Sequence, residues 1–230
     1  MSKIVKFIPN AITLLNILSG VFSIYFSSNG HLEWAAYAIF FAAVFDFFDG
    51  FVARLLNATS EIGKELDSLS DVVSFGVAPG FIAFQMLEAN MPQSFLSFIA
   101  FLIPLMAAYR LARFNVLHAT SSSFTGLPVP AVGIFFSSVV FLQAKEGLFF
   151  DFPNHLVIGF LLFNIILLSS LMVSNVKLFS LKLKSYNLKN AFWQYLLILL
   201  SIVLFLFFEL ASLWMVIYLY LLINIFKKAD

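Results

Sequence analysis

Long apolar runs separated by short polar stretches fill most of this chain of 230 residues. A run of about 20 apolar residues is long enough for a helix to cross the hydrocarbon core of a bilayer. The pattern therefore predicts an all-α fold, a polytopic helical membrane protein with one membrane domain over residues 1–230. About eight transmembrane helices are expected, at residues 11–28, 33–56, 66–87, 94–114, 131–144, 156–173, 191–208 and 210–225.

Composition agrees with this pattern. Hydrophobic residues make up 62% of the chain and charged residues only 11%, and the mean hydropathy is +1.00. These values exclude a soluble domain of this length. The absence of cysteine excludes disulfides and thiolate metal sites. The net charge of +1 carries no information by itself, so the positions of the charges matter more than their sum. The composition makes the lipid bilayer the expected partner, and we expect no nucleic acid.

The positions of the basic residues predict the orientation in the membrane. With eight spans, every Lys and Arg except Lys145 falls on the side of the N-terminus, and such an excess marks the cytoplasmic side. Residues 1–8 are expected on the headgroups, without a cleavable signal peptide. The lysines of the loop 175–190 are read first as an orientation signal and second as a headgroup site. We predict a cytoplasmic (inner) membrane protein with both termini in the cytoplasm.

Four aspartates interrupt the apolar pattern. Asp46 and Asp49 are three residues apart, and Asp67 and Asp71 four apart, so each pair projects from one helix face. If the two faces meet, carboxylates about 5 Å apart repel by roughly 3 kcal/mol per pair at an effective dielectric of about 20. Either protons or cations must then neutralise the cluster, and ligands that are all oxygen favour Mg²⁺ or Mn²⁺. A proton or cation transporter is the competing interpretation.

The residues around these aspartates form a longer pattern, D-x2-D-G-x2-A-R-x8-G-x3-D-x3-D, from Asp46 to Asp71. It resembles the signature of the CDP-alcohol phosphotransferase family. A transporter needs only the acids and leaves four fixed residues unexplained: Gly50, Ala53, Arg54 and Gly63. The resemblance implies a six-helix catalytic core, at residues 9–174. Two extra spans at 190–226 then either pack against this core or support a homodimer.

The resemblance also implies roles for individual residues. The four aspartates are expected to hold two divalent cations over the diphosphate of a CDP donor, and Asp71 to act as general base as well. The CDP donor is expected to contact a set of residues from the first two spans and the following turn. This set is Pro9, Asn10, Thr13, Asn16, Gly50, Arg54, Ser60 and Gly63. From the residues alone, helix–helix hydrogen bonds are an equal reading of Thr13 and Asn16, and a helix cap explains Ser60.

Segments elsewhere in the chain bear on the acceptor. Four segments resemble the family branch that transfers the phosphatidyl group of CDP-diacylglycerol to the hydroxyl of L-serine and releases CMP: LDSLSDVVSFGVAPG, YRLARFNV, FTGLPVPA and MVSNVKLFSLK. Arg110 and Arg113, three residues apart, are then expected to bind the serine carboxylate; snorkelling to the membrane surface is the alternative. An acceptor such as glycerol 3-phosphate or an inositol phosphate stays open, as does a membrane scaffold without catalysis.

Overall fold

The computed structural model describes residues 3–117, 125–144, 153–178 and 191–226. Within these ranges the chain is almost entirely helical and contains no strand, apart from an isolated bridge between Thr125 and Lys177. The α-helices are α1 (Lys3–Ser28), α2 (Leu32–Leu55), α3 (Glu61–Asp71), α4 (Ala78–Asn90), α5 (Leu102–Leu117), α6 (Val129–Ala144), α7 (Asn154–Val173), α8 (Phe192–Phe208) and α9 (Leu213–Phe226). Three other segments complete the set: the π-helix η1 (Val72–Val77) and the 3₁₀ helices η2 (Phe95–Phe101) and η3 (Glu209–Ser212).

The predicted fold class, an all-α polytopic membrane protein, is confirmed. In the described part of the chain, six helical stretches are long and apolar enough to cross a membrane: Phe7–Ser28, Leu32–Leu55, Glu61–Asn90, Phe95–Val116, Asn154–Val173 and Phe192–Phe226. This count is lower than the eight expected. The helix α6 has only 16 residues. The last two expected spans lie within the one stretch Phe192–Phe226, in which the chain turns back at Glu209, where φ is 52°, so that α8 and α9 pack on each other.

Two boundaries differ from the prediction. Pro9 was expected to open the first helix, but α1 begins at Lys3 and Pro9 lies inside it. A proline inside a helix removes one backbone donor, and here the helix continues on both sides of it. The polar turn expected over 57–65 is shorter, because Ser60 caps a helix that starts at Glu61.

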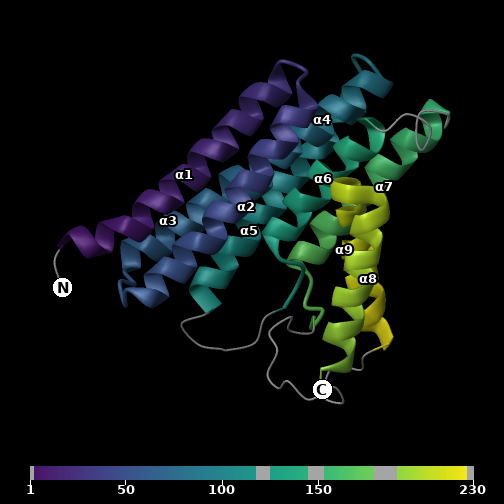
Figure 1. The fold of residues 1–230 in the computed structure, drawn as a ribbon. Coiled ribbons are helices and arrows are strands. Elements are labelled where there is room, and N and C mark those ends of the chain that lie inside the picture. Colours follow the sequence, from purple (N-terminus) through teal and green to yellow (C-terminus); the bar gives the residue numbers. More distant parts are fainter. Residues whose placement is uncertain (1–2, 118–124, 145–152, 179–190, 227–230) are drawn as a thin grey trace.

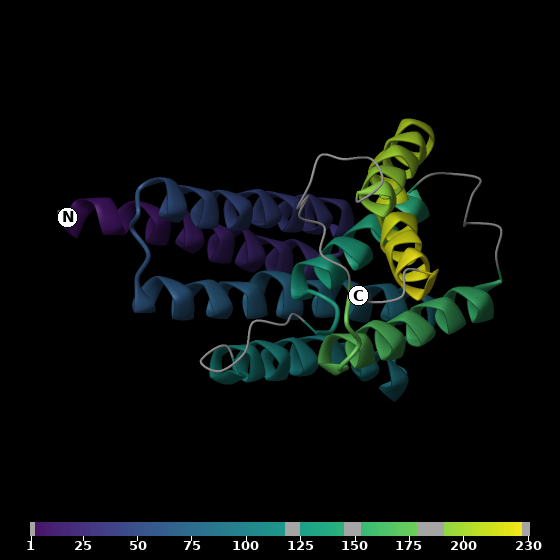
Figure 2. The ribbon, with the colours of Figure 1, turned by 90° about the horizontal axis from the view of Figure 1, so that it is seen from below.

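The helices α1, α2 and the continuous rod of α3, η1 and α4 run side by side (Figures 1 and 2). The start of α1, the end of α2, the start of α3 and the end of α5 gather at one end of the bundle (Figure 1). The pair formed by α8 and α9 stands on the side away from α1, with α9 packed on α6 and α8 on α9 (Figure 1). Of the two alternatives for these last helices, packing on the core or support of a homodimer, the contact of α9 with α6 agrees with the first.

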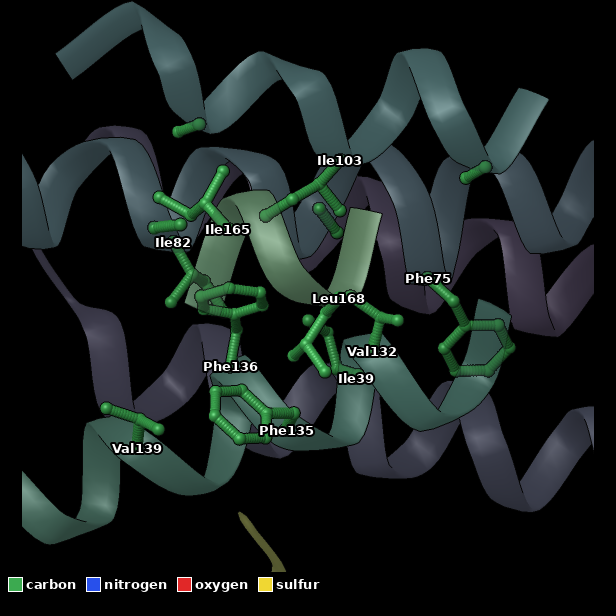
Figure 3. Packing of buried hydrophobic residues seen from close by; sticks show 14 of the residues in the cluster. Ile39, Phe75, Ile82, Ile103, Val132, Phe135, Phe136, Val139, Ile165 and Leu168 are labelled. Atoms are coloured by element: carbon green, nitrogen blue, oxygen red, sulfur yellow. The ribbon is translucent and has the colours of Figure 1, made fainter. Parts of the chain in front are cut away.

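The core lies where α2, η1, α4, α5, α6 and α7 meet (Figure 3). Phe75, Phe135 and Phe136 are its largest side chains and are fully buried. The inner face of α2 is made mostly of alanine, and small side chains let membrane helices approach closely. These alanines lie at residues 35–42, so they pack the middle of α2 against its neighbours, about one turn before Asp46.

Candidate active site

The two aspartate pairs meet at the end of the bundle where α2 ends and α3 begins. Asp46, Asp49 and Asp67 each offer one carboxylate oxygen, and these oxygens lie within 4.8 Å of one another. Asp71 stands beside Asp46 and completes the group from the α3 side. The helical spacing had predicted that each pair shares one helix face, and the packing of α1 against both α2 and α3 accompanies the meeting of the two faces.

Two oxygens of the cluster are buried without a hydrogen-bond partner. They are Oδ2 of Asp49, whose residue is 5% exposed, and Oδ1 of Asp71. A buried carboxylate oxygen without a partner is destabilising by several kcal/mol unless a cation or donor satisfies it. Since the group is all carboxylate, the residues present fit a hard divalent cation.

A pocket of about 380 Å³ opens over three of these carboxylates. It is lined by Pro9, Asn10, Thr13, Asp46, Asp49, Gly50, Ala53, Arg54, Ala58, Thr59, Ser60, Gly63, Lys64 and Asp67. Of the residues expected to contact a CDP donor, all but Asn16 line this pocket. Asn16 is fully buried, and neither atom of its side-chain amide has a partner.

The turn between α2 and α3 forms one wall of the pocket. The backbone N–H of Gly63 donates to Oγ of Ser60 at 3.0 Å, so Ser60 is the N-cap of α3. A Cβ at position 63 would lie 3.0 Å from both Oδ1 of Asn10 and Oγ of Ser60. Glycine is therefore the residue that lets the first turn of α3 come this close to α1.

Two polar residues of the pocket, Thr59 and Lys64, were not predicted from the sequence. Lys64 adds a second positively charged side chain, besides Arg54, to the pocket that the three aspartates line. Its spacing could have identified it, because Lys64 and Asp67 are three residues apart and share a face of α3. Thr59 lies in the turn between α2 and α3, where no helical periodicity predicts the direction of a side chain.

The two arginines of α5 have different surroundings. Arg110 interacts electrostatically with Asp71, and its buried Nε has no hydrogen-bond partner. Arg113 instead donates from Nη1 to the carbonyl of Val173, at 3.1 Å, and from Nη2 to Oδ1 of Asn175, at 2.7 Å. Both arginines were expected to bind the serine carboxylate beside the aspartates, but Arg113 is bonded to residues at the end of α7 and just beyond it. Neither arginine lines the pocket over Asp46, Asp49 and Asp67.

The model of the CDP-alcohol phosphatidyltransferase family matches residues 6–176 of this chain. The chain belongs to this family. The resemblance drawn from the pattern between Asp46 and Asp71 is thereby confirmed. Members of the family use divalent metals, which agrees with the all-carboxylate cluster on α2 and α3. The helices α8 and α9 lie beyond the matched residues.

Relatives within the family carry names that specify an acceptor. A CDP-diacylglycerol–serine O-phosphatidyltransferase of Helicobacter pylori is 37% identical over 67% of this chain and 65% of its own length. One of Methanocaldococcus jannaschii is 41% identical over 54% of this chain and 55% of its own. An archaetidylserine synthase of Methanothermobacter thermautotrophicus is 40% identical over 59% of each. The matched stretches thus span less than two thirds of each of these relatives.

Proposed function

We propose that this protein transfers the phosphatidyl group of CDP-diacylglycerol to the hydroxyl of L-serine and releases CMP, which is the activity of a phosphatidylserine synthase. One observation carries the proposal. The pocket joins the acidic cluster of the family to residues of α1, α2 and α3 that the family pattern assigns to the CDP group. The names of the relatives support serine as the acceptor.

The donor occupies the pocket with its diphosphate over the carboxylates. Two divalent cations, Mg²⁺ or Mn²⁺, held by Asp46, Asp49, Asp67 and Asp71, would neutralise the charge that develops on the leaving CMP. Arg54 and Lys64 line the same pocket and bind phosphate oxygens as hydrogen-bond donors. Ser60, Gly63 and Asn10 form the wall that receives the nucleotide.

The acceptor approaches from the side of Asp71 and Arg110. The serine hydroxyl oxygen attacks the phosphorus that carries diacylglycerol, the bond from that phosphorus to CMP breaks, and the hydroxyl proton passes to Asp71. The unpartnered Oδ1 of Asp71 is an acceptor available for this proton. Arg110 beside Asp71 binds the serine carboxylate. A carboxylate there also compensates the charge of a guanidinium within the bundle.

The amphiphilic donor explains why the pocket lies at one end of the bundle. The acyl chains of CDP-diacylglycerol stay in the hydrocarbon core, whereas the nucleotide stays in water. The pocket lies at the end of α2 and the start of α3, next to the turn 56–60. With the orientation proposed from the basic residues, this end faces the cytoplasm.

The test is CMP release by the purified protein from CDP-diacylglycerol with one acceptor at a time. We expect release with L-serine and none with glycerol 3-phosphate or an inositol phosphate. Excess chelator should stop the reaction, and added Mg²⁺ or Mn²⁺ should restore it. Release with another acceptor alone would replace serine in the proposal, and full activity in excess chelator would contradict the metal cluster.

A further inference from the structure

Four buried serines of the described residues donate to a carbonyl of their own helix: Ser19, Ser137, Ser138 and Ser212. Oγ of Ser137 donates to the Gly133 carbonyl at 2.8 Å, and Oγ of Ser138 donates to the Phe135 carbonyl at 2.7 Å. This local bond satisfies a buried hydroxyl without linking one helix to another.

Ser70 and Ser74 behave differently. Both are fully buried, and both donate across to α1. Oγ of Ser74 donates to the Asn16 carbonyl at 3.0 Å, and Oγ of Ser70 lies 3.5 Å from the Thr13 carbonyl. The two bonds therefore join α1 to the rod that carries Asp67 and Asp71, on consecutive turns of both.

Gly20 allows this contact. A Cβ at position 20 would lie 2.5 Å from Oγ of Ser74 and 2.8 Å from its Cα. Any larger residue must move α1 away from the rod, because the second of these atoms belongs to the backbone. The backbone of α1 at Gly20 is thus in direct contact with Ser74.

Ser74 belongs to the π-helix η1, which follows immediately after Asp71. The N–H of Ala78 bonds to the carbonyl of Val73, five residues earlier, so the turn is one residue wider than in an α-helix. Such turns are frequent at functional sites, where they redirect side chains. Here Ser74 faces α1, while Asp71, three residues earlier, reaches the acidic cluster.

We propose that Ser70 and Ser74 are positioning residues, which together with Gly20 hold α1 at the distance from the acidic cluster that a bound CDP group requires. Thr13, whose carbonyl faces Ser70, lines the pocket together with Pro9 and Asn10 of the same helix. A shift of α1 would therefore move one wall of the pocket relative to Asp46, Asp49 and Asp67. The inference rests on the proposed function, because it takes CDP as the ligand of this pocket.

The test measures CDP binding in the presence of Mg²⁺, by calorimetry on the full chain in detergent. Ser74→Ala should weaken CDP binding about fivefold, the effect of one lost hydrogen bond. Gly20→Ala should weaken it more than about tenfold, because the overlap involves backbone. Ser137→Ala and Ser138→Ala, which remove equally buried hydroxyls bonded within α6, should stay within about twofold of the wild type. In turnover, Ser74→Ala should raise KM for CDP-diacylglycerol and leave kcat within about twofold.

Unchanged CDP affinity in Ser74→Ala would overturn the inference, and so would equal losses in the two α6 controls. If Gly20→Ala does not fold, Ser74→Ala decides alone. A wild-type protein that binds no CDP would instead reject the proposed function itself, so the two failures are distinguishable.

Discussion

At the scale of single residues, the site separates into a part open to the pocket and a part behind it. Asp46, Asp49 and Asp67 line the pocket, whereas Asp71 does not. Asp71 faces Arg110 and keeps one oxygen without a partner. The carboxyl group of Asp71 thus interacts with both the other aspartates and the guanidinium of Arg110. This position suits the proposed role of a general base for the serine hydroxyl.

Asp71→Asn tests the role of this residue as general base. The amide keeps the shape of the side chain and one oxygen, but it cannot accept the serine proton. Serine-dependent CMP release should fall by at least about 10²-fold, the lower range for loss of general acid–base catalysis. CDP binding, measured by calorimetry, should be largely retained. Release near the wild-type rate would remove Asp71 as the base.

The two arginines of α5 are expected to give different results. Arg110→Ala should raise the KM for serine roughly ten- to a hundredfold, the effect of losing one charged hydrogen-bonding partner, and Arg110→Lys should recover only part of the loss. Arg113→Ala should raise this KM less and lower the stability by about 1–3 kcal/mol, because the carbonyl of Val173 and Oδ1 of Asn175 lose their donor.

Steady-state kinetics and thermal unfolding of the same preparations give both quantities. If both alanine variants raise the KM for CDP-diacylglycerol and leave that for serine unchanged, the arginines belong to the donor site. An equal rise in the serine KM would show that Arg113 also contacts the acceptor, as the sequence suggested.

At the scale of elements, hydrogen bonds between polar side chains hold helices together whose surfaces are otherwise apolar. Nδ2 of Asn115 on α5 donates to Ser68 on α3 at 3.1 Å and to Glu65 at 3.2 Å. On the other side of the bundle, Tyr218 of α9 donates to Oδ1 of Asn164 at 2.5 Å. In a bilayer, helix association depends on packing and such bonds, because lipid chains are as apolar as the side chains. These hydrogen bonds therefore help to determine which faces of the helices pack together.

Tyr218→Phe tests how α9 is held on the core. The change keeps the ring, which packs on Phe135 and Trp214, and leaves Oδ1 of the fully buried Asn164 without its donor. Stability should fall by about 0.6–1.5 kcal/mol, while CMP release stays unchanged because the pair lies outside the pocket. Thermal unfolding checks this, with Tyr25→Phe as control, since Tyr25 is 61% exposed. Equal stability of the two variants would contradict a structural role for the bond.

At the scale of the whole molecule, every residue of the pocket lies at one end of the bundle, at the start of α1, the end of α2 and the start of α3. The opposite end carries the short connection between α1 and α2, at residues 29–31. Lys and Arg gather with the pocket in the eight-span prediction. The structure and the charge pattern together make the orientation testable.

The chain has no cysteine, so single-cysteine variants report the orientation directly. Glu61→Cys places a thiol at the pocket end and Asn29→Cys places one at the other end, both at exposed positions. In intact cells a membrane-impermeant maleimide should label Asn29→Cys and leave Glu61→Cys unlabelled. Permeabilised cells, in which both should react, are the control. The reverse labelling would place the pocket outside the cytoplasm.

The sequence by itself determined the membrane class, the four aspartates and the family. Apolar runs and helical spacing are local properties, and a pattern such as that from Asp46 to Asp71 carries both residue types and distances. Most of the pocket residues followed for the same reason, because the pattern already joins α2 to α3. The cap at Ser60 was also readable, since capping depends on residues only three positions apart.

Only the tertiary structure decided which helices bring these residues together and where the arginines point. The spacing of Arg110 and Arg113 puts them on one helix face. In the folded protein, however, Arg110 interacts with Asp71 of α3, whereas Arg113 donates to the carbonyl of Val173 on α7. The bonds from Ser70 and Ser74 to α1 join residues more than 50 positions apart. No periodicity along the chain encodes such contacts, because they depend on how close two helices can approach, and at Gly20 that distance is set by a missing side chain.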